Sequence, residues 1–368
     1  MQNRSFSKIY ILSIANFASG GPELLHQLAY SLRLMGLNAY MYYVGNQGVS
    51  NDYDPVPENY KIYNIPYVFE VNDSNENLLV IPEISLKFIP LFHDINCVIW
   101  WLSVDNAYVQ FDLINEFYNR NNLISRFFCK LVSIMKVVPP FNRLYFKYSY
   151  FRLKWWINTY AKKPRVKHWA QSYYALNFLK TLGVDEINYL SDYLRSDYLK
   201  LSSEVDLSKK QNIVVYNPKK GVKFTKKIIA AAGSQIVFIP IKDMSILEVT
   251  DLLLRAKVYI DFGEHPGKDR IPREAAVLGC CVITGKRGSA AYFEDVPIPE
   301  QYKFNQDKSN ISEIISIILK CFEHFEYNYS NFSLYRKQIL NEHNLFVNSL
   351  KKLFVEADDE GINSYSCI

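Results

Sequence analysis

The sequence predicts an α/β protein made of two doubly wound domains, and three observations support this. With 368 residues the chain is too long for one ordinary core and suits two domains of roughly 150–200 residues each. In both halves, short apolar runs that are typical of strands buried on two faces alternate with amphipathic segments. The hydrophobic content of 49% and the charged content of 21% are those of a folded globular chain.

The first domain, predicted over residues 1–200, opens with a strand, a glycine turn, a helix and a second strand. The apolar run "KIYILSIA" predicts the first strand. Gly20 and Gly21 predict a tight turn after it, Pro22 suits a first helical position, and Gly36 ends the helix. The run "NAYMYYV" predicts the second strand. Later apolar runs predict strands at residues 78–82, 97–103 and 167–172.

The second domain, predicted over residues 201–350, repeats this alternation. The polar stretch 201–211 is expected to be the linker that precedes it. The predicted strands are "NIVVYNP", "QIVFIP", "KVYIDFG" and "CCVIT", and the predicted helices are "KFTKKIIAAA", "SILEVTDLLLRA" and "NISEIISIILKCFEHF". Residues 351–368 are expected to form the end of a last helix and a loose tail.

The cysteines and the hydropathy pattern predict a cytoplasmic protein. The six cysteines show no paired spacing, and Cys97, Cys280 and Cys281 stand in apolar runs, where a cysteine acts as a small hydrophobe. This pattern favours a reducing compartment. No segment reaches 18 uninterrupted apolar residues, so neither a signal peptide nor a spanning helix is expected.

The charge of the chain is unevenly distributed. From Phe117 to Val184 the sequence has no acidic residue, and it has 13 basic ones interleaved with aromatic residues. This mixture favours contact with an anionic membrane surface through residues 117–167, so a peripheral position on the inner face of the membrane is expected. A solvated basic face is the alternative. A nucleic-acid groove uses similar residues, but no nucleic-acid partner is expected.

Two loops are predicted to meet a ligand. In open α/β sheets, ligands bind at the carboxyl ends of the strands, where the first turns of helices present free N–H groups to anions. The turn at Gly21 lies at such a place in the first domain, and the loop "GEHPGKDR" lies at one in the second. The sequence therefore predicts a ligand held in a cleft between the two domains.

The segment "REAAVLGCCVIT" resembles part of a known family motif. It is similar to the second half of the motif in the E-x7-E branch of the GT-B glycosyltransferases, which have two Rossmann-like domains. The resemblance implies that Glu274 binds the ribose hydroxyls of a nucleotide. The first glutamate of the motif is not matched, because Pro266 stands in its place and Glu264 lies two residues too early. The resemblance then leaves the contact with the donor sugar to His265 or Asp269.

Further segments resemble the family in the expected order. The segment "NFASGGPE" is similar to the loop that approaches the donor phosphates, and "YNPKKG" is similar to a segment whose basic residues hold the diphosphate. For each of these residues a structural role, as a helix cap or as part of a solvated loop, is the alternative. The residues expected to bind the nucleotide or its diphosphate are Gly21, Lys219, Lys220, Lys268, Arg270, Arg273, Glu274 and Ser289.

Acidic residues after the first domain's strands are candidates for a catalytic base. Asp105 follows an apolar strand, where it is able to deprotonate an acceptor hydroxyl or to cap a helix beginning near Ala107. Glu23 is an alternative base, and Glu83 is a third. The sequence has no D-x-D pair placed to bind a divalent metal ion, so a metal-independent reaction without a cofactor is expected.

Together these features predict a glycosyltransferase. The expected donor is a nucleotide sugar, UDP-linked, and the expected acceptor is a glycan or a lipid-linked glycan of bacterial surface polysaccharide, of the O-antigen or capsule type. Inversion and retention of the sugar's configuration both stay open. Two alternatives remain: a glycan- or nucleotide-binding subunit without catalysis, and a nucleotide-sugar epimerase.

Overall fold

The chain folds into two compact units. The computed structural model describes residues 6–45, 54–111 and 141–355. The first unit comprises Met1–Ala170, Leu179–Leu190 and Leu345–Ile368, and the second comprises Gln171–Phe178 and Ser191–Asn344. The chain therefore passes between the units four times, after residues 170, 178, 190 and 344. The ranges predicted from the sequence, 1–200 and 201–350, are continuous and do not include these returns.

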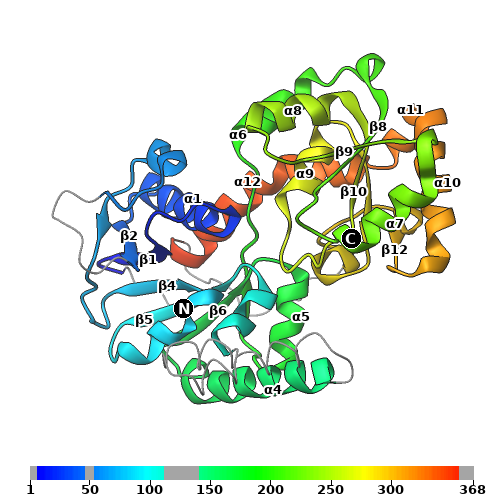
Figure 1. Ribbon diagram of the computed structural model, residues 1–368. Helices are drawn as coiled ribbons and strands as arrows, with labels where there is room; N and C mark the ends of the chain where they lie inside the picture. Colours follow the sequence, from blue (N-terminus) through cyan, green and yellow to red (C-terminus); the bar gives the residue numbers. More distant parts are fainter. Residues whose placement is uncertain (1–5, 46–53, 112–140, 356–368) are drawn as a thin grey trace. The chain divides into compact units, whose positions relative to one another are not determined.

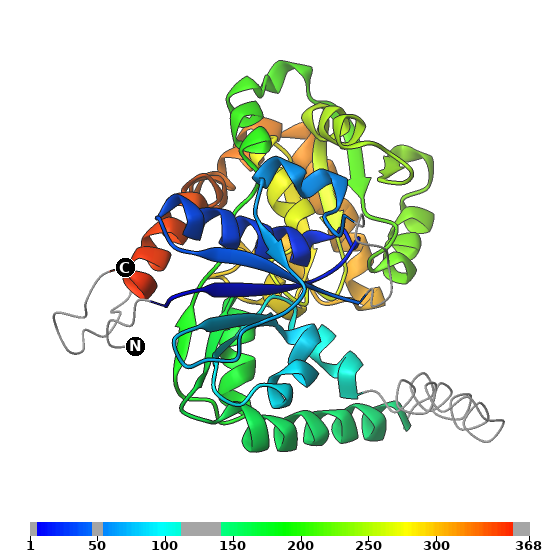
Figure 2. The same cartoon turned by 90° about the vertical axis from the view of Figure 1, so that its left-hand side faces the viewer.

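The first unit is built on a parallel sheet. Its seven strands have the order β3-β2-β1-β4-β5-β6-β7. Figures 1 and 2 show helix α1 on one side of this sheet and helix α4 on the other. Because helices cover both faces, all five residues of β4 are buried, and the strands read as continuous apolar runs. The strands are β1 Ile9–Ile14, β2 Ala39–Val44, β3 Tyr67–Val68, β4 Leu78–Pro82, β5 Asn96–Trp101, β6 Val166–Ala170 and β7 Ile187–Tyr189.

The second unit is built on a smaller parallel sheet. Its five strands have the order β12-β11-β10-β8-β9. In this order β8 and β10 are neighbours in the sheet, although β9 lies between them along the chain. Such a reversal of strand order is typical of a doubly wound sheet. The strands are β8 Gln211–Tyr216, β9 Val237–Pro240, β10 Ala256–Asp261, β11 Cys281–Gly285 and β12 Lys303–Phe304. The predicted α/β class with two doubly wound domains is thereby confirmed.

The helices connect these strands. The α-helices are α1 Gly20–Leu34, α4 Phe141–Trp156, α5 Tyr173–Thr181, α6 Ser196–Leu201, α7 Val222–Ala232, α8 Ile246–Arg255, α9 Arg270–Val277, α10 Ile311–Glu323, α11 Phe325–Ser330 and α12 Ser333–Phe354. The 3₁₀-helices are η1 Glu58–Tyr63, η2 Glu83–Leu91, η3 Val104–Phe111, η5 Ser202–Glu204, η6 Leu207–Lys209, η7 Gly233–Gln235, η8 Gly288–Ala291, η9 Glu300–Tyr302 and η10 Lys308–Asn310, and η4 Ile157–Ala161 is a π-helix. Among the helices of the described residues, none is long and apolar enough to cross a membrane.

The stretch 201–211, predicted as the linker between domains, lies inside the second unit. Its last part is tied down by Lys210, whose ammonium group is buried. Lys210 Nζ donates to the carbonyl oxygens of Leu253, Ala256 and Leu278 at 2.9, 3.0 and 2.6 Å. Carbonyls at helix ends lack hydrogen-bond donors within the helix, and here one ammonium group serves as the donor for three of them. The polar composition reflects the exposure of most of this stretch, and only its end at Lys210 is buried in the unit.

Candidate functional site

The loop between β10 and α9, which contains the sequence "GEHPGKDR", follows the carboxyl end of a central strand. The side chain of Asp261, the last residue of β10, accepts hydrogen bonds from the Tyr259 hydroxyl at 3.0 Å and from the Gly263 N–H at 2.8 Å. The Gln306 amide donates to the Phe262 carbonyl at 2.7 Å. These bonds fix the start of the loop, so its charged side chains project from a held backbone.

Two glycines with positive φ pack against this loop. Gly221, at φ +59°, ends the loop after β8, and Gly288, at φ +52°, begins η8. A Cβ on Gly221 would collide with the Phe262 carbonyl, and one on Gly288 would collide with the carbonyls of Glu264 and His265. Both positions need glycine for the close approach as well as for the backbone angle.

Ser289 holds the loop from the same side as Gly288. Its hydroxyl donates to the Gly267 carbonyl at 2.7 Å, and its backbone N–H donates to the His265 carbonyl at 2.9 Å. The side chain is 1% exposed. The sequence predicts that Ser289 binds the nucleotide, and the geometry shows a hydroxyl already used to position the loop.

His265 lies between two carboxylates. Its Nδ1 is 2.9 Å from Asp269 Oδ2, and its Nε2 is 3.5 Å from Asp261 Oδ1. Burial opposes ionisation of the ring, but the hydrogen bond that His265 donates to Asp269 and the charges of both aspartates raise the pKa of His265 above its ordinary value. Lys220 Nζ is 2.6 Å from Asp269 Oδ1. The structure thus brings together three of the predicted residues, Lys220, His265 and Asp269.

The same group has ligand atoms close enough for a metal ion. One ligand atom from each of Asp261, His265 and Asp269 lies within 4.8 Å of the others. Positive charge is already present there, since the Lys220 ammonium group contacts Asp269. Burial would raise the pKa of Asp269, but His265 and Lys220 together hold it below its ordinary value. An ammonium group at this distance would repel a bound cation.

Lys268 and Arg273 are engaged in a buried ion network. Lys268 Nζ is 2.8 Å from Glu342 Oε1, and Arg273 Nη1 is 2.8 Å from Glu342 Oε2. Arg273 Nη2 is 2.5 Å from Asp192 Oδ2. The Arg273 side chain is 1% exposed and the Lys268 side chain is 3% exposed. Both residues are predicted to bind the diphosphate, but their charges are neutralised by carboxylates of the protein.

The remaining predicted residues of the second unit differ in exposure. Glu274 lies on α9 and is buried, at 8% exposed. Arg270 is the first residue of α9 and is half-buried. Lys219 is exposed in the loop after β8, where its backbone N–H donates to the Asn217 side chain at 2.9 Å. Among the predicted basic residues of this unit, Lys219 is therefore the exposed one, Lys220 and Arg270 are half-buried, and Lys268 and Arg273 are buried.

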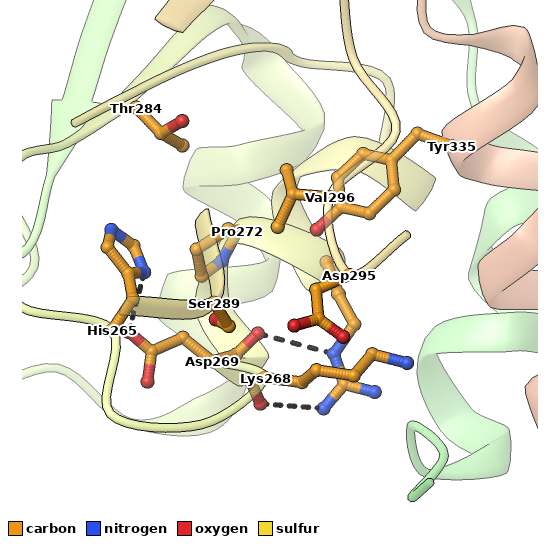
Figure 3. A pocket seen from close by; sticks show the side chains of 10 residues that line it. His265, Lys268, Asp269, Pro272, Thr284, Ser289, Asp295, Val296 and Tyr335 are labelled. Atoms are coloured by element: carbon orange, nitrogen blue, oxygen red, sulfur yellow. Dashed lines mark hydrogen bonds and ion pairs between the residues drawn. The ribbon is translucent and has the colours of Figure 1, made fainter. Parts of the chain in front are cut away.

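A small pocket opens beside His265. In Figure 3 the Lys268 side chain extends away from His265, and Asp295 lies beside it. The Thr284 hydroxyl is buried and has no hydrogen-bond partner within the described part of the chain, so it is able to bond a ligand or a water molecule. The pocket is lined by His265, Lys268, Asp269, Pro272, Arg273, Thr284, Ser289, Asp295, Val296 and Tyr335.

In the first unit, Gly21 and Glu23 lie in the first turn of α1. Glu23 is buried at 7% exposed, and its carboxylate accepts a hydrogen bond from the Tyr63 hydroxyl at 3.3 Å. His26, one turn later, is fixed by the Pro22 carbonyl and by the Tyr43 hydroxyl, both at 2.7 Å. Burial lowers the pKa of His26 to about 4, so the ring is neutral near pH 7.

Glu83 and Asp105 follow neighbouring strands of the first unit. Glu83 comes directly after β4 and is 2% exposed, and its carboxylate accepts the Leu102 N–H at 2.8 Å. Burial raises the pKa of Glu83 to about 7, although backbone N–H groups oppose this shift. Asp105 lies in the first turn of η3 and is half-buried. Glu83 thus fixes the start of the loop that carries Asp105.

Of the predicted membrane segment 117–167, residues 117–140 lie outside the described residues, and most of the described part is α4. Large apolar side chains at Phe141, Leu144, Tyr148, Phe151 and Trp155 are each 46–63% exposed. Their spacing of three, four, three and four residues places them in one stripe along the helix. Lys147 and Arg152 lie over the rings of Phe151 and Tyr148 at 6.0 and 5.7 Å.

No protein-family model matches the chain, and no curated protein is similar to it in sequence. Solved structures do match. One is the Anabaena protein HepE (Alr3699) in complex with UDP-glucose, with 13% identity, coverage of 94% of this chain and 99% of that chain, and a TM-score of 0.57. The chain has the GT-B fold.

Two further GT-B structures agree. Sucrose-phosphate synthase from Thermosynechococcus elongatus has 10% identity, coverage of 94% and 98%, and a TM-score of 0.58. WaaG, a glycosyltransferase involved in lipopolysaccharide biosynthesis, has 11% identity, coverage of 92% and 98%, and a TM-score of 0.51. These matches cover nearly the whole of each chain, and the predicted GT-B-like fold is thereby confirmed.

Sequence reasoning missed the acidic partners of the site. Asp192 and Glu342 neutralise Arg273, and Asp261 contacts His265. Asp295 accepts the N–H groups of Tyr173 and Tyr174, the first residues of α5, at 2.8 and 3.0 Å. Asp261 carried a readable signal, because it lies near the end of the predicted strand "KVYIDFG", beside the charged loop. The other three lie far along the chain, and no spacing pattern marks them.

Proposed function

We propose that this chain is a glycosyltransferase that transfers a sugar from a UDP-linked donor to a glycan or lipid-linked acceptor. The observation that carries the proposal is the cluster of Lys220, His265 and Asp269 at the carboxyl end of β10, followed at once by α9 with Glu274. A ligand of an open α/β sheet binds at this edge. The match to HepE, which was solved with UDP-glucose, favours UDP as the nucleotide.

The second unit supplies the groups that a nucleotide diphosphate requires. Lys219, Lys220, Arg270 and the first turn of α9 neutralise the diphosphate as it leaves, which is the larger catalytic contribution and needs no metal ion. Glu274 accepts hydrogen bonds from the ribose hydroxyls. His265 contacts the donor sugar, with Asp269 and Asp261 holding its ring in place.

The first unit supplies the acceptor side. Asp105, or alternatively Glu23, takes the proton from the acceptor hydroxyl if the reaction inverts the sugar's configuration. Both residues follow strands of the parallel sheet at the end where ligands bind. Glu83 fixes the backbone that leads to Asp105 through the bond to the Leu102 N–H. We assign the acceptor to the surface polysaccharides of bacteria, to which the match with WaaG also points.

A nucleotide-release assay tests the proposal. Incubated with UDP-glucose and related donors, the wild-type chain is expected to release UDP faster when a lipid-linked glycan acceptor is present. Tight UDP binding without release from any donor would favour the binding subunit. Interconversion of the donor's sugar without an acceptor would favour the epimerase. The absence of UDP binding would contradict the proposal itself.

Replacing Glu274 with alanine is expected to weaken UDP binding. Loss of charge-assisted hydrogen bonds to the ribose corresponds to an affinity roughly 10–100-fold lower. Isothermal titration with free UDP measures the change. Glu313→Ala, in which an exposed carboxylate of α10 is removed from the same unit, is the control and is expected to bind UDP like the wild type. Equal affinities of the two variants would remove the ribose assignment.

We also propose that the enzyme works on the cytoplasmic face of a membrane and that α4 lies in the headgroup plane of an anionic bilayer. The exposed stripe from Phe141 to Trp155 is the apolar face, and basic residues flank it. Tyr145, Ser149, Leu153 and Trp156 form the buried face of the helix. A second copy of the chain is a poorer occupant, because residues 117–184 offer no acid to pair with the basic residues.

The triple variant Lys147→Gln, Arg152→Gln and Lys154→Gln is expected to bind phosphatidylserine vesicles at least about tenfold more weakly, since each juxtamembrane charge contributes about 1 kcal/mol. Added salt is expected to weaken wild-type binding in the same way. Sedimentation with vesicles measures both. A matched triple variant on α7, Lys223→Gln, Lys226→Gln and Lys227→Gln, removes three exposed charges elsewhere. If both triple variants lose binding equally, α4 is not the membrane face.

A further inference from the structure

Lys268 contacts three segments of the chain that are distant in sequence. Its backbone N–H donates to the Gln171 side chain at 3.0 Å. Its ammonium group donates to the Ser191 hydroxyl and to the Glu342 carboxylate, each at 2.8 Å. All four residues belong to the second unit. One residue of the loop between β10 and α9 is therefore bonded to three separate parts of this unit.

These three parts each lie at or near a point where the chain passes between the two units. Gln171 is the first residue after one passage between the units, Ser191 is the first after another, and Glu342 lies two residues before the last residue of the second unit, Asn344. Asp295, which lines the same pocket, accepts the first two N–H groups of α5, the helix within which the chain returns to the first unit. Residues that line the pocket are thus hydrogen-bonded to residues at or near three of the four passages, and to the first turn of the helix that contains the fourth.

The ammonium group of Lys268 is unsuited to hold a diphosphate directly. It is buried, it contacts a carboxylate at 2.8 Å, and that carboxylate is shared with Arg273. Turning Lys268 toward a ligand would leave Glu342 with half of its charge-assisted bonds and Ser191 without its donor, a costly change in a buried site. The side chain also extends away from His265 (Figure 3).

We propose that Lys268 is a positioning residue that couples the donor loop to the segments where the chain passes between its two units. The inference rests on the proposed function, because it takes the loop after β10 as the donor site. A donor that orders this loop also orders the Lys268 backbone, and the three hydrogen bonds carry that order to Gln171, Ser191 and Glu342. Coupling of this kind is a free energy shared between two sites.

Hydrogen exchange with and without UDP tests the coupling. In the wild type, saturating UDP is expected to slow exchange about tenfold in residues 171–178, 191–194 and 340–344, as well as in the loop 263–269. In Lys268→Met the backbone bond to Gln171 remains, so the slowing is expected to remain in the loop and in residues 171–178 and to disappear from residues 191–194 and 340–344. The UDP affinity of this variant is expected to stay within about threefold of the wild type, while kcat for transfer falls about tenfold.

Two further variants separate coupling from a general effect on folding. Lys268→Arg keeps the charge and is expected to restore the slowing in the segments at Ser191 and Glu342. Lys337→Met removes an exposed lysine from α12, the helix that carries Glu342, and is expected to behave like the wild type. If Lys268→Met does not fold, Glu342→Gln is measured in its place, because it removes the charge that holds the ammonium group.

The outcomes are distinct. A loss of UDP affinity of about tenfold or more in Lys268→Met would overturn the inference, because it identifies Lys268 as a diphosphate ligand. Slowing that persists in residues 191–194 and 340–344 of that variant would overturn it too. So would wild-type protein in which UDP protects the loop but none of the segments. A wild type that binds no UDP would instead overturn the proposed function, and the inference with it.

Discussion

Arg273→Met is expected to lower the free energy of unfolding of the second unit by about 3–5 kcal/mol, because breaking a buried ion pair leaves an uncompensated buried charge. Asp192 and Glu342 both face the Arg273 guanidinium group, at 2.5 and 2.8 Å, and each is 1–2% exposed. Removal of the arginine leaves two carboxylates of like charge, of which Glu342 keeps its contact with the Lys268 ammonium group and Asp192 loses the partner closest to it. The measurement is hydrogen exchange of the β8, β10 and β11 amides, since all five tryptophans belong to the first unit.

The control for this prediction is Arg255→Met. Arg255 pairs with Asp251 on the surface of α8, where the two side chains are 44% and 64% exposed, so a cost below about 1 kcal/mol is expected. If Arg273→Met costs no more than this control, the buried network contributes little to stability. A small cost would also remove the structural reason for excluding Arg273 from diphosphate binding.

The loss of unfolding free energy in Arg273→Met is expected to depend on pH. In the wild type, burial opposes ionisation of Asp192, but Arg273 and then Lys268 hold the pKa of its carboxyl below its ordinary value. Without Arg273, burial raises that pKa. If the pKa of a carboxyl is higher in the folded than in the unfolded chain, ionisation of that carboxyl lowers the free energy of unfolding. The loss develops as the pH rises above the pKa of the unfolded chain, and it disappears when the carboxyl is protonated at low pH. The variant's deficit is therefore expected to be larger at pH 8 than at pH 5.

The fold could be predicted from the sequence because the main strands are buried on both faces. The run "LLVIP" coincides with β4, and "CVIWWLS" lies within two residues of β5, since both faces of each strand are apolar. The strands β3 and β12 have two residues each and β7 has three, which is too short for any pattern. Whether such short edge segments form strands is decided by pairing with the sheet beside them rather than by their own sequence.

The site could be predicted only where it is local in the chain. His265 and Asp269 are four residues apart, and Lys220 follows a predicted strand, so all three were assigned to the ligand loops. Lys268 and Arg273 were assigned to the diphosphate for the same reason, because a cation in a loop after a strand suits an anion. Their partners Asp192 and Glu342 lie 69–81 residues away in the chain. A distant buried acid leaves no pattern near the cation that it neutralises.

Gly288→Ala is expected to lower UDP affinity at least about tenfold and to destabilise the second unit by about 1–3 kcal/mol, because an added methyl group in a packed site forces the backbone to shift. The new Cβ would collide with the carbonyls of Glu264 and His265. Those carbonyls cannot give way alone, since the His265 carbonyl accepts the Ser289 N–H at 2.9 Å. The loop must move as a unit, and His265 and Asp269 move with it.

Gly36→Ala separates this collision from backbone strain. Gly36 also has a positive φ, +82°, but a Cβ there meets nothing within 4 Å. That variant carries the cost of the left-handed conformation, about 1 kcal/mol, and is expected to bind UDP like the wild type. Titration with UDP and thermal unfolding of both variants make the comparison. Should Gly288→Ala retain wild-type affinity, the loop after β10 either does not contact the nucleotide or tolerates displacement, and the contact between η8 and the loop would then serve packing alone.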